Sequence, residues 1–282
     1  MKRTINLSPI TKTINLQLLT LFLSGTVLVG CGESKKESSS DEQKIDSVAN
    51  SEKTAVANSP NQLSEKEKED GWKLLFDGKS TDGWRGYLKD SFPEKGWTIE
   101  DGALKVQGAG TGEAGNGGDI IFDEEFKDFE LSLEWKISEG GNSGIFYLAE
   151  EIEGEPIFTS APEMQILDND RHPDAKLGKD GNRQAGSLYD LIPAKPQNAK
   201  PVGEWNKVSI LVYRGTVVHT QNGENVVEYH LWTDEWKEMI KDSKFKDWNS
   251  FLNAGGDDKK GYIGLQDHGD DVWFRNIKIK EL

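Results

Sequence analysis

The sequence has little of several things on which whole classes of protein depend. It has one cysteine and four histidines in 282 residues, and 34 basic side chains against 49 acidic ones, so its formal net charge is −15. A chain this acidic does not offer the basic surface that nucleic acids or anionic lipids require. A single cysteine also cannot form a disulfide within the chain. We therefore expect no nucleic-acid partner and no disulfide.

The apolar run near the start of the chain is short. It extends from Leu16 to Val29, follows three basic residues, and is too short to span a bilayer comfortably. This arrangement is typical of a signal peptide, which we assign to residues 1–30. The run ends in Leu-Val-Gly-Cys31, which resembles a bacterial lipobox. The resemblance implies cleavage before Cys31 and lipidation of its sulfur, so we expect a lipid-anchored protein of the bacterial cell envelope, at the outer membrane or cell surface.

Residues 31–70 contain no aromatic side chain and are rich in Ser, Lys, Glu and Asn. Such a segment buries too little apolar area to offset the entropy of ordering, so it is predicted to be a disordered tether. One short charged helix is predicted over residues 63–69. Ser64 is its expected N-cap, with Glu67 three residues on.

Residues 71–282 are predicted to form one β-rich domain. Five apolar residues between Phe129 and Ile137 alternate with polar ones, which indicates a half-buried strand. Asn222-Gly223 is a strong hairpin signal. About a dozen short runs of this kind, separated by turn residues, favour an all-β, two-sheet sandwich over a parallel sheet. One inserted helix is predicted over residues 234–252, where apolar residues recur at helical spacing.

The segment Glu-Met-Gln-Ile-Leu-Asp at 163–168 carries polar groups on one side of a predicted strand. Met164 and Ile166 share one face, whereas Glu163 and Gln165 share the other, about 7 Å apart. If the apolar face belongs to the core, a carboxylate and an amide point outward together. The alternative is a solvated strand face followed by an Asx-rich turn.

Several segments together resemble the family of 3-keto-disaccharide hydrolase domains, and they cover nearly all of residues 71–282. They are Gly71–Gly78, Gly83-Trp84, Trp97–Leu104, Asp119-Ile120, Phe129–Lys136, Asn142–Ile145, Glu163–Asp168, Gly186–Tyr189, Trp205-Asn206, Asn222-Gly223, Gly264–Gly269 and Phe274–Ile277. The resemblance implies a concanavalin A-like jelly-roll sandwich. It also implies cleavage of glycosides that are already oxidised to a ketone at C3, with a small carbohydrate as the partner.

A ketone at C3 acidifies the proton on C2, so cleavage by elimination needs three groups. These are a base near C2, a positive or hydrogen-bonding group near the ketone oxygen, and a proton donor for the leaving oxygen. We expect Glu163 to be the base, His268 the proton donor and Arg275 the group that stabilises the enolate. The expected substrate-binding residues are Gln165, Glu134, Gln266, Tyr189 and Asp168.

Asp170 and His172, close to Asp168, loosely resemble a site for a hard metal ion, so a divalent metal stays open as a cofactor. Two other functions also stay open. One is a non-catalytic, lectin-like carbohydrate-binding module, because a fold does not determine a function. The other is a conventional glycosidase, although the strand at 163–167 lacks the second and third acids that some jelly-roll glucanases carry there.

Overall fold

The computed structural model describes residues 59–109 and 115–282, and these belong to one compact unit. The signal peptide, Cys31 and most of the predicted tether therefore lie outside the described residues. None of the helices in the described ranges has the length and apolar character needed to cross a membrane.

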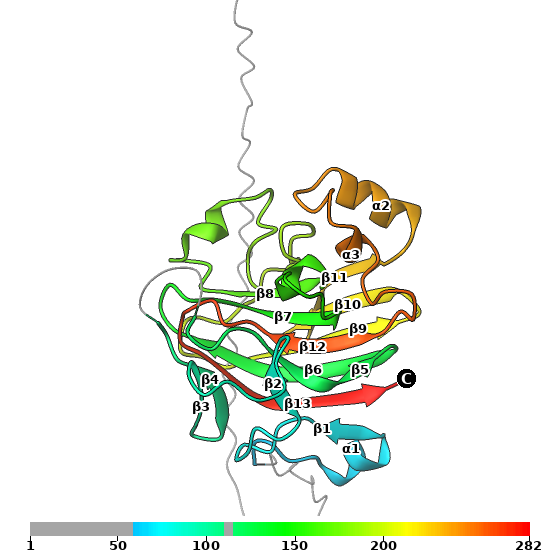
Figure 1. Ribbon diagram of the computed structural model, residues 1–282. Coiled ribbons are helices and arrows are strands. Elements are labelled where there is room, and N and C mark those ends of the chain that lie inside the picture. Colours follow the sequence, from blue (N-terminus) through cyan, green and yellow to red (C-terminus); the bar gives the residue numbers. More distant parts are fainter. Residues whose placement is uncertain (1–58, 110–114) are drawn as a thin grey trace, which may run out of the picture. The chain divides into compact units, whose positions relative to one another are not determined.

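Within the described residues, thirteen strands form two antiparallel sheets that pack face to face (Figure 1). In spatial order the larger sheet contains β11 (Glu224–His230), β10 (Thr216–Gln221), β9 (Asn206–Tyr213), β6 (Phe129–Ile137), β13 (Val272–Glu281), β4 (Ala103–Val106) and β3 (Trp97–Glu100), with β1 (Trp72–Leu74) beside β13. The smaller sheet contains β2 (Trp84–Gly86), β5 (Ile120–Phe126), β12 (Gly261–Leu265), β7 (Asn142–Ala149) and β8 (Glu163–Leu167). The predicted two-sheet jelly-roll sandwich is confirmed.

Alternation along the strands explains why the sheets form. In β6 the apolar residues from Phe129 to Ile137 are at most 3% exposed, and Glu130, Glu134 and Lys136 between them are half-exposed. The predicted hairpin joins β10 to β11, and Asn222 and Gly223 have φ angles of 48° and 90°. Positive φ at both central residues is what a type I′ turn requires.

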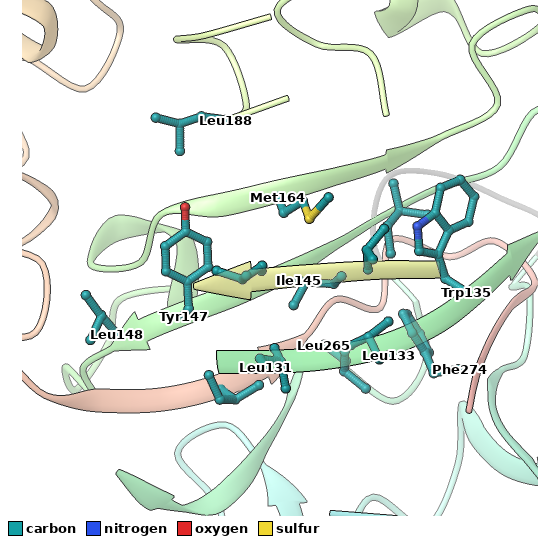
Figure 2. Close-up of a cluster of buried hydrophobic side chains, with 14 of the residues drawn as sticks. Leu131, Leu133, Trp135, Ile145, Tyr147, Leu148, Met164, Leu188, Leu265 and Phe274 are labelled. Atoms are coloured by element: carbon teal, nitrogen blue, oxygen red, sulfur yellow. The ribbon is translucent and has the colours of Figure 1, made fainter. Parts of the chain in front are cut away.

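The core lies between the two sheets, as Figure 2 shows. Leu131 and Leu133 of the larger sheet and Ile145, Met164 and Leu265 of the smaller sheet are all at most 1% exposed and belong to one cluster. Met164 and Ile166 thus point into the sandwich. The other face of β8, which carries Glu163 and Gln165, therefore lies on the outside of the smaller sheet.

The helix predicted over 234–252 is broken in two. α2 covers Asp234–Lys241 and α3 covers Asn249–Leu252. Between them the Ser243 hydroxyl donates to the carbonyl of Ile240 and accepts from the N–H of Phe245. These side-chain hydrogen bonds of Ser243 replace the backbone hydrogen bonds that would continue the helix, so α2 ends here. The chain then turns, and residues 244–248 approach the smaller sheet.

The folded domain begins before residue 71, the boundary predicted from the sequence. Helix α1 (Glu65–Glu69) has the expected capping box between Ser64 and Glu67. The Asn61 backbone N–H and side-chain oxygen exchange hydrogen bonds with Asn276, and its amide donates to the carbonyl of Gly102. Lys278 of β13 also pairs with Glu67. Residues 59–70 are therefore packed on the larger sheet and are not part of a tether.

The short 3-10 helices η1 (Ile157–Thr159) and η2 (Pro173–Lys176) lie on either side of β8 in the sequence. η1 contacts both β7 and α3. The loops before and after β8, together with the α2–α3 insertion, thus lie around the outer face of the smaller sheet.

Candidate active site

A cavity of about 410 Å³ lies over the outer face of the smaller sheet. Its volume is within the range of small-molecule sites. The described residues that line it are Gly115, Gly118, Asp119, Asn142, Phe158, Ala161, Glu163, Gln165, Tyr189, Lys244, Phe245, Trp248, Phe251, Gln266, Asp267 and His268. Five of these were predicted from the sequence to be functional: Glu163, Gln165, Tyr189, Gln266 and His268.

Glu163 is the central carboxyl group of this cavity, and only 8% of it is exposed. Its side chain lies across Gly144 of β7, where any Cβ atom would collide with the carboxylate. Burial raises the pKa of Glu163 to about 8; the negative charges of Asp119 and Asp174 add to this rise, and the positive charge of Lys244 opposes it. Glu163 is therefore a stronger base than an ordinary carboxylate when it is ionised.

Gln165 holds the Glu163 carboxylate from the same strand face. With its amide nitrogen turned toward acceptors, Gln165 donates to the carbonyl of Ser143 (3.0 Å) and to Oε1 of Glu163 (3.2 Å). The neighbouring Gln266 follows β12, and its backbone N–H donates to the carbonyl of Gly144. Its side-chain Oε1 is buried and has no partner among the described residues, so it can accept from a ligand hydroxyl.

Asp119, at the start of β5, is a second carboxyl group in the cavity. Its Oδ1 accepts the backbone N–H of Asp267 at 3.0 Å. Burial nevertheless raises the pKa of Asp119 to about 7, with a further contribution from the charge of Asp267. Asp267 is itself held by the backbone N–H groups of Gly117, Gly118 and Gly269. Asp119 therefore holds its proton at a higher pH than an ordinary aspartic acid does.

Lys244 supplies the positive charge of the cavity. Its Nζ lies 4.1 Å from the centre of the Tyr189 ring and 3.7 Å from Oδ2 of Asp190. Burial lowers the pKa of Lys244 from its ordinary value, and the neighbouring carboxylates oppose this effect. The Tyr189 hydroxyl donates to Asp174 at 2.9 Å, and Asp174 also pairs with Arg183 at 2.7 Å. This network fixes the Tyr189 ring against Lys244.

The structure brings His268 and His172 together, with ring centres 6.2 Å apart. His268 lines the cavity, and its Nε2 lies 3.1 Å from the Asn142 amide nitrogen. His172 instead accepts the backbone N–H of Asp174 and is not among the lining residues. In residues 59–109 and 115–282, no group of three or more His, Cys, Asp or Glu side chains is placed to hold a metal ion, Asp170 and His172 included.

Glu134 and Arg275, both predicted to belong to the site, do not line the cavity and lie on the larger sheet. Glu134 of β6 and Arg275 of β13 are cross-strand partners in the larger sheet, whereas Glu163 belongs to the smaller one. The two pair with each other at 2.7 Å, and the Arg275 guanidinium lies 3.9 Å from the centre of the Trp205 ring. Strand alternation indicates that Glu134 points outward, but it cannot tell which sheet a strand joins.

Asp168 also lies outside the cavity lining. Its carboxylate accepts the backbone N–H groups of Gly140, Asp170 and Arg171. It therefore closes the turn after β8, which corresponds to the Asx-rich turn of the alternative interpretation. Because both carboxylate oxygens accept backbone hydrogen bonds, the role of Asp168 among the described residues is structural.

Sequence reasoning did not select Asp119, Lys244, Phe158 or Trp248. Asp119 lies in one of the segments that carry the family resemblance. That resemblance could have identified Asp119 as a candidate site residue. Lys244 and Trp248 come from the interruption of a predicted helix, and Phe158 comes from a connecting segment. Lys244, Trp248 and Phe158 come close to β8 through tertiary packing, which cannot be predicted from local sequence patterns.

Comparison with known proteins shows the family to which the chain belongs. Residues 71–280 match the family described as the 3-keto-alpha-glucoside-1,2-lyase-like domain. A 3-keto-disaccharide hydrolase of Bacteroides thetaiotaomicron is 55% identical over 279 residues, which cover 92% of this chain and 96% of that protein. The chain belongs to the 3-keto-alpha-glucoside-1,2-lyase-like family. Every described residue that lines the cavity lies within the matched range of this family.

Solved structures show the same fold. A Parabacteroides distasonis structure, described as a candidate glycosyl hydrolase, superimposes with a TM-score of 0.68 at 30% identity and covers 79% of this chain and 100% of its own. A second such structure from the same organism has a TM-score of 0.57 at 26% identity and covers 75% of this chain and 99% of its own. The sandwich of this family member is thus shared with proteins of divergent sequence.

Proposed function

We propose that this protein cleaves 3-keto-glycosides by elimination across C1 and C2, followed by addition of water. The observation that carries the proposal is Glu163, a buried carboxyl group with a raised pKa at the centre of a cavity in a 3-keto-alpha-glucoside-1,2-lyase-like domain. The identity of 55% to a protein named 3-keto-disaccharide hydrolase supports the same substrate class.

In the first step, Glu163 takes the proton from C2. The C–H electron pair forms a C2–C3 double bond, and negative charge develops on the ketone oxygen. Asp119, whose raised pKa of about 7 keeps it partly protonated, donates a hydrogen bond to that oxygen. A carboxylic acid kept neutral by its surroundings can stabilise an enolate in this way. Asp119 takes the role that the sequence analysis gave to Arg275.

In the second step, the enolate oxygen re-forms the C3 ketone, the electron pair of the C2–C3 double bond forms a C1–C2 double bond, and the C1–O bond breaks. Lys244, whose pKa is lowered by burial, donates a proton to the leaving oxygen, so that a neutral alcohol departs. Water then adds to C1 and gives one proton to the Lys244 amine, and the proton held by Glu163 returns to C2. His268 and Gln266, at the same end of the sheet as Asp119, bind the hydroxyls of the keto sugar.

The test is to incubate the protein with a 3-keto-glucoside and with its unoxidised parent. We expect release of the alcohol from the keto form alone, and its loss in Glu163→Gln with ligand binding retained. Release from the parent would indicate a conventional glycosidase. Binding without turnover would indicate a lectin-like module.

We further propose that the protein is exported and anchored through a lipid on Cys31. The support is the apolar run of residues 16–29, followed by the lipobox-like sequence that ends in the only cysteine of the chain. Cys31→Ser should move the protein from the membrane fraction to the soluble fraction of cells. If this variant stays with the membranes, another segment anchors it.

A further inference from the structure

The cavity has two chemically different ends with Glu163 between them. The polar end contains Asp119 at the start of β5, Asn142 at the start of β7, and Gln266 and His268 after β12. These strand ends are adjacent because β5, β12 and β7 are antiparallel neighbours. A keto sugar, which carries several hydroxyl groups, finds its hydrogen-bond partners here.

The other end has an aromatic wall, which we define as Phe158, Phe245, Trp248 and Phe251. Phe158 lies on η1, and the other three come from α3 and the segment that precedes it. The ring centres of Phe158 and Trp248 are 5.8 Å apart, and those of Phe245 and Trp248 are 5.2 Å apart. Two connections far apart in sequence thus meet in one apolar surface.

Strand register places the two ends on opposite sides of Glu163. Gln165 pairs with Gly144, whereas Glu163 pairs with Phe146. Glu163 is therefore about 7 Å further from the polar end than Gln165 along β8. η1 lies on the chain just before Glu163, so its Phe158 is beyond the carboxylate. If C2 lies at Glu163 and the ketone at the polar end, the C1 substituent points to the aromatic wall.

The aromatic end offers few hydrogen-bond partners to a leaving group. Among the described residues that line it, the polar groups are the Lys244 ammonium, the Tyr189 hydroxyl and the single indole N–H of Trp248. The Tyr189 hydroxyl already donates to Asp174, and Lys244 serves the leaving oxygen itself, which every alcohol carries. A second sugar would exchange its hydrogen bonds to water for apolar contacts here, which costs free energy, whereas an apolar ring gains by stacking.

Phe158 and Trp248 keep exposed surface available for such stacking. Phe158 is 39% exposed, and Trp248 is half-buried, although both are large and apolar. Resting on the proposed function above, we propose that the aromatic wall is the leaving-group subsite and that it selects 3-keto-glycosides of apolar, ring-bearing alcohols.

The test compares three 3-keto-glucosides: the methyl glycoside, the benzyl glycoside and a disaccharide of two glucose units. All three substrates release an alcohol as the leaving group. A difference in rate between them therefore reports contact with the aromatic wall and not a more acidic leaving group. We expect kcat/KM to be highest for the benzyl glycoside. Phe158→Ala and, separately, Trp248→Leu should lower kcat/KM for the benzyl glycoside about tenfold and change it little for the methyl glycoside and the disaccharide.

Two variants are used because either one alone could fail to fold. Tyr213→Ala is the matched control, since Tyr213 is also a partly exposed aromatic residue but belongs to β9 of the larger sheet. Equal losses for all three substrates, or a loss confined to the disaccharide, would overturn this inference while the proposed function stands. If the wild-type protein turns over none of the three, both proposals fail.

Discussion

Replacing Glu163 by Gln should make the protein more stable, and the gain should grow with pH. The wild-type carboxyl is 8% exposed, and burial raises its pKa from 4.5 to about 8. Between these two values the folded protein binds this proton and the unfolded chain does not. Stability therefore falls as pH rises through this window, and the full loss is reached only above about pH 8.

The size of the effect follows from the two pKa values. Each unit of pKa difference corresponds to about 1.4 kcal/mol, so the free energy of unfolding should fall by about 3 kcal/mol between pH 5 and pH 8 because of this one group. The glutamine side chain of the variant cannot ionise, and its amide occupies nearly the same volume as the carboxyl group. The difference in stability between Glu163→Gln and the wild type should therefore increase by about that amount over the same interval.

The assay is urea unfolding followed by tryptophan fluorescence at pH 5, 6, 7 and 8. Other groups also titrate in this range, Asp119 among them, but they are common to both proteins and largely cancel in the difference. Tyr213→Ala should follow the wild-type pH dependence. A difference between Glu163→Gln and the wild type that stays constant from pH 5 to pH 8 would refute the claim that burial raises the pKa of Glu163.

Four further outcomes are expected. Gly144→Ala should lower kcat at least tenfold by displacing the Glu163 carboxylate, with unchanged near-UV circular dichroism as evidence of an intact fold. Lys244→Met should lose about 100-fold in kcat with an alkyl leaving group but little with 4-nitrophenol, which departs without a proton; equal losses would remove Lys244 as the acid. Asp119→Asn should abolish the fall in kcat/KM on the alkaline side of the pH optimum that ionisation of the wild-type carboxyl causes, and a pH–rate profile identical to the wild type would contradict its role. Ser64→Ala should lower the free energy of unfolding by about 1 kcal/mol in the same urea assay if α1 belongs to the folded domain, and by nothing measurable if it does not.

Local sequence determined much of the sandwich. Alternation in β6 is a period-2 pattern that only a half-buried strand satisfies, and Asn222-Gly223 adopts the two positive φ angles that a tight hairpin needs. The same alternation on β8 separated Met164, which lies in the core, from Glu163, which lies in the cavity. These features depend on neighbours within a few residues, so they can be read from the chain directly.

The composition of the site was decided by tertiary structure. Glu134 and Glu163 both occupy outward strand positions, yet strand order places them on opposite sheets, and order depends on contacts between residues far apart in sequence. Lys244 reaches Tyr189 only because α2 ends before Ser243, and Phe158 meets Trp248 only because two connections cross the same sheet face. The raised pKa of Glu163 has the same origin: the sequence supplies the carboxyl group, but only the surrounding fold excludes water from it.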